Sequence, residues 1–116
     1  MADNKQYKQY IEQAQENGNV MISEDVIATI VTHAVEEVEG VAGLGNAAKK
    51  GWGKALKIAI SLDNELSIEC NVIVVYGQSV FDVAKNVQTA IANAILSMTG
   101  VAVAKVNVNV SGIVRK

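Results

Sequence analysis

The chain has no proline, one cysteine, one histidine and few aromatic residues among its 116 residues. The single cysteine, Cys70, cannot form an internal disulfide, which fits a reducing compartment. Aromatic residues make up 4% of the chain, so platforms on which nucleic-acid bases could stack are scarce. The formal net charge of -2 is too small for bulk attraction to nucleic acid or to an anionic membrane. We therefore expect no nucleic-acid partner.

Long hydrophobic runs are also missing. No apolar run approaches the roughly 18 residues of a membrane span, and residues 1–16 lack the apolar core of a signal peptide. We therefore expect a cytoplasmic protein; if it meets a membrane, something else must hold it there. Hydrophobic residues make up 50% of the chain, and its length fits one globular domain that needs no metal or disulfide to fold.

The N-terminal segment differs from the rest of the chain. Residues 1–18 form a polar leader, and residues 19–116 are predicted to form a single domain. Tyr7, Tyr10, Ile11 and Ala14 recur at helical spacing, which allows a short amphipathic helix. The alternative is a frayed, partly disordered arm, and this alternative is favoured because chain ends are often loose.

Turn residues and hydrophobic periodicity predict six elements in the order β-α-β-β-α-β. One helix begins at an N-cap, Ser23, and ends at Gly40, and the other runs from Ser79 to Gly100. Alternating apolar residues predict strands at residues 20–22, 56–62, 66–74 and 101–110. This pattern specifies an α+β two-layer sandwich, with two helices on one face of a small mixed sheet and the other face partly open.

No residue pattern indicates catalysis, a cofactor or a metal. Residues 43–48 match the letters G-x-G-x-x-A, but a helix precedes them where a dinucleotide site needs a strand. His33 has no cysteine partner or spaced carboxylate, so it is interpreted as a helix-surface residue. Cys70 lies in phase with apolar neighbours, which predicts a buried thiol. We therefore expect a protein that is not an enzyme.

A glycine- and lysine-rich loop is the first candidate binding surface. Lys49, Lys50 and Lys54 surround Trp52, which suits contact with a phosphate, an anionic lipid or an acidic partner. The favoured alternative is a solvated loop whose tryptophan lies against the edge of the core.

The open face of the sheet is the second candidate. There the pattern places an apolar group beside Asn71, Asn107 and Asn109, a mixture that suits a partner or self-association. An ordinary half-exposed face is an equally good interpretation. The apolar group consists of Ile73, Val75, Val101 and Val103. The candidate partner-binding residues on the two surfaces are Lys49, Lys50, Trp52, Lys54, Ile73, Val75, Val103 and Lys105.

Several segments resemble a known family. They are GNVMISEDVI at 18–27, VEGVAGL at 38–44, VIVVYGQSV at 72–80, VAKNVQ at 83–88 and VNVNVSGI at 106–113. Together they resemble the alkaline shock protein family, also described as envelope stress response proteins, over roughly residues 18–114. The turn at Tyr76-Gly77 and the helix step at Val87-Gln88 are the most specific parts. The loop at 43–54 and the leader look individual.

The resemblance implies a protein of mainly Gram-positive bacteria without known catalysis. Some members lie against the cytoplasmic membrane, held by a small membrane-anchored partner. The leading hypothesis is therefore a stress-response protein that acts as a structural or adaptor protein through contacts with such a partner or with itself. The alternative is a small-molecule-sensing or regulatory domain linked to fatty-acid synthesis, since other members are connected with restraint of an acetyl-CoA carboxylase.

Overall fold

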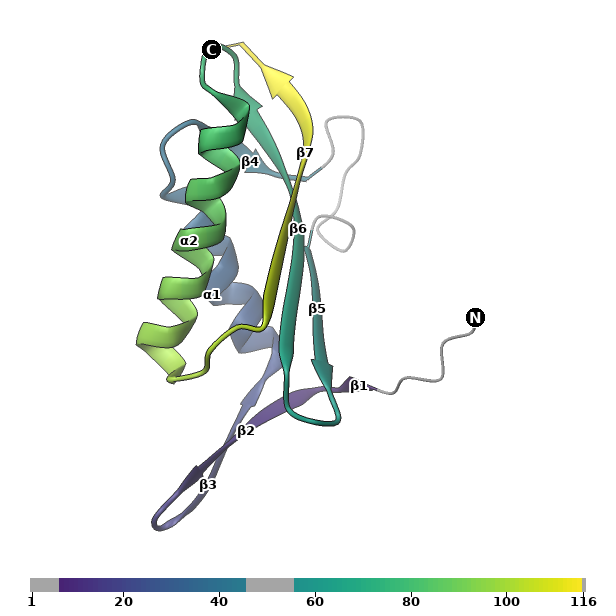
Figure 1. The fold of residues 1–116 in the computed structure, drawn as a ribbon, viewed down its shortest axis with the longest axis vertical. Helices are drawn as coiled ribbons and strands as arrows, with labels where there is room; N and C mark the ends of the chain where they lie inside the picture. Colours follow the sequence, from purple (N-terminus) through teal and green to yellow (C-terminus); the bar gives the residue numbers. More distant parts are fainter. Residues whose placement is uncertain (1–6, 46–55, 116) are drawn as a thin grey trace.

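The computed structural model describes residues 7–45 and 56–115. Over these residues the chain forms a mixed sheet with two helices on one of its faces (Figure 1). The predicted α+β class is confirmed. In chain order the elements are β1 (Tyr7–Lys8), β2 (Tyr10–Gln15), β3 (Gly18–Ser23), α1 (Glu24–Glu36), β4 (Val41–Leu44), β5 (Leu56–Ser61), β6 (Leu66–Val75), α2 (Val80–Thr99) and β7 (Lys105–Val114).

Strand β6 is the centre of the main sheet. Along one side it pairs with β5 and then with β4, both antiparallel, and β1 pairs with β5. Along the other side it pairs with β7 in parallel, from Ser67 opposite Lys105 to Val75 opposite Val114. Strand β7 is therefore an edge of the sheet among the residues described here.

One core lies between the sheet and the helices. Alternate residues of β6 point toward the helices and are buried, because side chains alternate between the two faces of a strand. Each helix buries one stripe of residues at spacings of three and four, as the sequence predicts. The buried residues of these three elements are Leu66, Ile68, Cys70, Val72 and Val74 from β6, Ile27, Ile30, Val31 and Val35 from α1, and Val83, Val87, Ile91 and Ile95 from α2.

The helix caps follow the sequence except at one end. Ser23 and Ser79 cap the two helices by accepting a hydrogen bond from a backbone N–H three residues later, and Gly100 ends α2 in the left-handed conformation. The prediction that Gly40 caps α1 is wrong, because the helix ends at Glu36.

Gly40 nevertheless has a specific role in the turn that leads into β4. Its φ is +96°, and a Cβ atom there would lie 2.8 Å from Cγ2 of Val83. The carbonyl of Gly40 also accepts a hydrogen bond from the N–H of Val75 at 2.8 Å. The close approach of this turn to α2 therefore requires a residue without a side chain.

The part of the leader that the structure describes is a hairpin, not a helix. Strands β2 and β3 pair around a tight turn that joins Gln15 to Gly18, and the hairpin projects beyond the helices (Figure 1). Ile11 anchors it in the core. Asn64, in the turn after β5, donates through Nδ2 to the carbonyl of Glu12 at 2.7 Å and accepts from its N–H at 3.0 Å. Residues 1–6 lie outside the described residues.

The last strand begins later than the sequence predicts. Strand β7 starts at Lys105, and the N–H of Ala104 makes a hydrogen bond to the carbonyl of Leu66 at 2.8 Å. Val101 is buried and Val103 packs against the core, so the expectation that these valines share the open face is wrong. The alternation of apolar residues continues through Val101 and Val103. These residues do not belong to the strand, however, but to the segment in which the chain returns from α2 over the end of the core.

Candidate protein-binding surface

The face of the sheet turned away from the helices is polar over most of its length. Ser67, Glu69 and Asn71 of β6 point to this face. Asn109 of β7 donates through Nδ2 to Oε2 of Glu69 at 3.1 Å, and Lys57 of β5 lies opposite Glu69. Paired polar side chains of this kind are typical of a solvated sheet face.

The same face becomes apolar where β6 ends. Ile73 and Val75 are only half-buried, and Val75 is paired with Val114 of β7. The chain then continues to Tyr76, whose N–H donates to the carbonyl of Val114 at 2.6 Å. Through this pairing, residues almost 40 positions apart in the sequence lie side by side at one end of the sheet.

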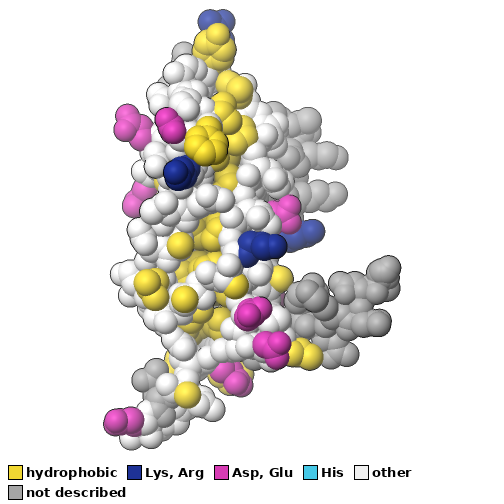
Figure 2. All heavy atoms as spheres, viewed as in Figure 1, with side chains coloured by type: hydrophobic (Ala, Val, Ile, Leu, Met, Phe, Trp, Pro, Cys, Tyr) yellow, Lys and Arg dark blue, Asp and Glu magenta, His cyan; other side chains and the backbone are white. Residues whose placement is uncertain are grey.

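Further exposed apolar side chains gather at this end. Phe81 in the first turn of α2 is 72% exposed, Tyr76 is 65% exposed and Ile113 is 52% exposed. Figure 2 shows hydrophobic side chains at the top of the molecule, over the start of α2 and the end of β7, with basic side chains beside them. We call this surface the apolar end; it consists of Val75, Tyr76, Val80, Phe81, Ile113 and Val114.

Two cations flank the aromatic rings of the apolar end. The guanidinium carbon of Arg115 lies 5.3 Å from the centre of the Tyr76 ring, and Nζ of Lys85 lies 5.8 Å from the centre of the Phe81 ring. Aromatic residues and arginine are enriched in the centres of protein interfaces, where they contribute most of the binding energy. The composition of the apolar end is therefore that of a protein-binding surface.

The predicted partner-binding residues that the structure describes do not lie on a single surface. Val75 belongs to the apolar end and Ile73 adjoins it, whereas Lys105 pairs with Ser67 at the opposite end of β6. Val103 packs against the core, away from the open face. Those predicted in the loop lie outside the described residues: Lys49, Lys50, Trp52 and Lys54.

Sequence reasoning missed Tyr76, Phe81 and Ile113 as surface residues. A signal for Phe81 was available, because its position does not belong to the buried stripe of α2. A large aromatic residue off the buried stripe of a helix is a candidate for binding. No comparable signal identifies Ile113, whose exposure depends on how far β7 extends along β6.

Cys70 does not provide a reactive group. Its side chain is buried, and burial, with a smaller contribution from the neighbouring Glu69 carboxylate, raises the pKa of the thiol from 9.0 to about 11. The thiol is therefore protonated at neutral pH and is a poor nucleophile. Among residues 7–45 and 56–115, no group of three or more His, Cys, Asp or Glu side chains could hold a metal ion.

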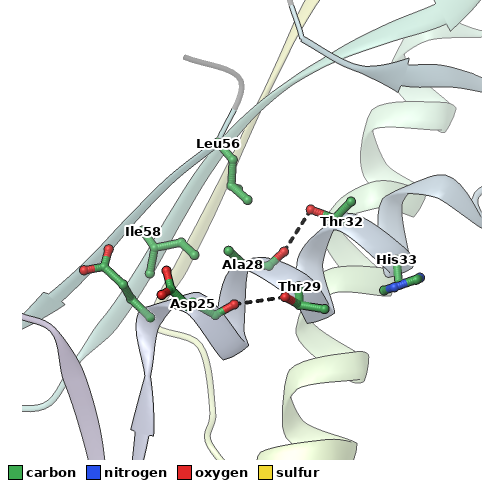
Figure 3. Close-up of a pocket in the computed structure, with 8 residues that line it drawn as sticks. Asp25, Ala28, Thr29, Thr32, His33, Leu56 and Ile58 are labelled. Atoms are coloured by element: carbon green, nitrogen blue, oxygen red, sulfur yellow. Dashed lines mark hydrogen bonds between the residues drawn. The ribbon is translucent and has the colours of Figure 1, made fainter. Parts of the chain in front are cut away.

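A groove lies between α1 and β5, on the helix side of the sheet. It has a volume of about 420 Å³, an apolar floor of Ala28, Leu56 and Ile58, and a polar rim that includes Asp25. Figure 3 shows Asp25, Ala28, Leu56 and Ile58 gathered between helix and strand, while His33 points away from β5. The remaining rim residues are Glu24, Thr29 and Thr32.

The comparison with family models identifies the family. Residues 12–115 match the model of the alkaline shock proteins, whose description gives a cell envelope-related function. The chain belongs to the alkaline shock protein family. The match covers both helices, the main sheet from β4 to β7 and most of the hairpin. The resemblance found in the sequence is confirmed, and a cell envelope-related function is the function that the family supports.

Relatives in this family come from Gram-positive bacteria. The chain is 33% identical over 105 residues to the YqhY protein of Bacillus subtilis (strain 168), covering 83% of this chain and 77% of that protein. It is 31% identical over 103 residues to the Spy1535 protein of Streptococcus pyogenes serotype M6, covering 84% and 80% of the two chains. The similarity to these proteins therefore extends over most of the domain.

Solved structures of MamM CTD share the fold. Two variants superpose with a TM-score of 0.58 at 15% sequence identity, each covering 77% of this chain and 94% or 96% of the MamM CTD chain. At this level of identity the likeness concerns the fold alone. Within the part of the chain that the structure describes, no helix is both long enough and apolar enough to cross a membrane.

Proposed function

We propose that this member of the alkaline shock protein family is a non-enzymatic adaptor in the envelope stress response. In this role it binds a membrane-anchored protein partner at the inner face of the cell membrane through its apolar end. The observation that carries the proposal is the exposure of Tyr76 and Phe81, with Arg115 and Lys85 beside their rings. Solvent-exposed apolar patches rimmed by polar groups mark interaction sites on soluble domains.

The apolar end can supply enough binding energy for a specific contact. An aromatic side chain buries roughly 150–250 Å² in an interface. At about 25 cal/mol per Å², the two rings together contribute several kcal/mol. The guanidinium of Arg115 and the ammonium of Lys85 orient an acidic group of the partner and increase the rate of association.

The edge of the sheet lies next to the apolar end and extends the surface. Strand β7 is an edge strand among the described residues, and it ends at Val114 within the apolar end. An edge strand offers backbone N–H and C=O groups to an added strand, which gives affinity independent of side chains. A partner that covers the apolar end therefore has main-chain hydrogen bonds within reach.

Site-specific photocrosslinking in the native cell tests this proposal. A photoreactive amino acid replaces Phe81 in one version of the protein and Thr89 in the control, which is exposed about two turns further along α2. We expect a discrete crosslink to an envelope protein from position 81 and none from position 89. Equal crosslinking from both positions, or none from position 81, would contradict the proposal.

A further inference from the structure

Apart from His33, which points away from β5, the polar side chains on the rim of the groove between α1 and β5 accept hydrogen bonds and do not donate them. Oγ1 of Thr29 donates its proton to the carbonyl of Asp25 at 3.1 Å, and Oγ1 of Thr32 donates to the carbonyl of Ala28 at 2.9 Å (Figure 3). Both hydroxyls therefore present only lone pairs to the groove. Ionised carboxylates of Glu24 and Asp25 also only accept. A ligand that forms hydrogen bonds with this rim must therefore supply the donor groups.

The negative charge around the groove also favours a ligand that donates hydrogen bonds. Glu24 and Asp25 line it, and none of the lining residues within 7–45 and 56–115 is a lysine or an arginine. A groove with this excess of carboxylates attracts cations.

The floor of the groove requires an apolar body next to the cation. Leu56 and Ile58 are half-buried and face the same side of the sheet as the core residues of β6, with Ala28 of α1 across from them. Lysine and arginine side chains combine an aliphatic stem with a cationic head that donates several hydrogen bonds. The stem matches the floor, and the head matches the carboxylates and hydroxyl lone pairs of the rim.

The shape of the surface favours a polypeptide over a small molecule. The groove is open, and a second hollow of about 310 Å³ lies on the other side of α1, between it and α2. The two hollows share Thr29 and His33, so they flank one stretch of α1. Small-molecule sites usually enclose most of the ligand surface, whereas a chain can lie over both hollows at once.

We propose that the groove between α1 and β5 binds a lysine or arginine side chain presented by a basic segment of a partner protein. The aliphatic stem lies on Leu56 and Ile58, and the cationic head bonds to Asp25. This site is independent of the apolar end, which lies at the opposite end of β6 from the turn that precedes Leu66. A protein with both sites bridges two partner surfaces.

The test uses the full chain and an amphipathic leucine–lysine peptide about 18 residues long, which is long enough to cover both hollows as a helix. A peptide with glutamate in place of lysine is the matched control for charge. Fluorescence anisotropy gives the dissociation constant, and amide chemical shifts give the location of binding. In the doubly substituted variant E24Q/D25N the rim loses both charges, while E36Q removes one charge from α1 outside the groove.

We expect the lysine peptide to bind and the glutamate peptide not to bind, with shift changes in residues 24–33 and 56–58. We expect E24Q/D25N to weaken binding about 10-fold, as for loss of hydrogen bonds to a charged group, and E36Q to change it less than about twofold. Equal affinity in both variants, or shift changes confined to the apolar end, would overturn the proposal. Spermidine that binds as tightly as the peptide would also overturn it, because the ligand would then be a small amine.

Discussion

The two faces of strand β6 are built from the same ten residues and serve different purposes. On the helix side, alternate residues from Leu66 to Val74 are buried in the core. On the other side, Ser67, Glu69 and Asn71 are polar, and only Ile73 and Val75, at the end of the strand, are apolar. The comparison teaches that stability is concentrated on the helix side along the whole strand, whereas recognition is concentrated at the end of the sheet, where β6, the start of α2 and the end of β7 meet.

The largest expected difference between the faces concerns stability. Ile68 is 1% exposed and faces the helices, so Ile68→Ala should reduce the free energy of unfolding by about 2–5 kcal/mol. Its neighbour Glu69 is exposed, so Glu69→Ala should change the free energy of unfolding by less than about 0.5 kcal/mol. Urea unfolding followed by circular dichroism measures both. Comparable losses in the two variants would refute the division between the faces.

A smaller loss of stability is expected from a substitution in the turn between α1 and β4, which is hydrogen-bonded to the end of β6. In Gly40→Ala the new Cβ would lie 2.8 Å from Cγ2 of Val83, at a φ of +96° that disfavours alanine. We expect this variant to lose about 1–3 kcal/mol of stability. Gly43→Ala is the matched control, because no heavy atom lies within 4 Å of its added Cβ. If Gly43→Ala is as destabilising as Gly40→Ala, the close approach is not the cause.

Burial of Cys70 on the helix side predicts a dependence of stability on pH. The thiol pKa rises from 9.0 to about 11 in the folded chain, so the unfolded chain loses this proton first as the pH increases. The stabilising contribution is complete below pH 9.0 and is lost between pH 9.0 and about 11. At pH 10 the loss is about 1 kcal/mol relative to neutral pH.

The measurement compares the wild type with Cys70→Ala, in which this loss should be absent. Because alkaline pH affects the stability of a folded chain in other ways as well, only the difference between the two proteins is informative. Parallel stability curves for both proteins from pH 8 to pH 11 would show that burial of the thiol does not carry the effect.

The sequence predicts the parts of the fold that local patterns determine. The alternation in β6 identifies its two faces, and Ser23, Ser79 and Gly100 mark three helix ends correctly. These signals are local because each depends on backbone hydrogen bonds or on the side-chain period of a single element.

The remaining features depend on distant pairing and could not be predicted locally. Residues 10–15 have helical spacing, but pairing with β3 and the bonds between Glu12 and Asn64 hold them in a strand. The Asn17-Gly18 pair was the available sequence signal for this hairpin, whose two turn residues are Glu16 and Asn17. The apolar end requires the parallel register that places Val114 beside Val75, and no local pattern of either strand specifies that register.

Only a small effect on stability is expected from substitutions at the apolar end, and such substitutions provide the most direct test of its role in recognition. In a Tyr76→Ala/Phe81→Ala double variant both residues are exposed, so the free energy of unfolding should change by less than about 1 kcal/mol. A photoreactive residue at Val80 in this variant reports partner contact in the cell. We predict a nearly unchanged unfolding curve together with loss of the crosslink formed from position 80 in the otherwise wild-type chain. Retention of that crosslink with both rings removed would contradict the account.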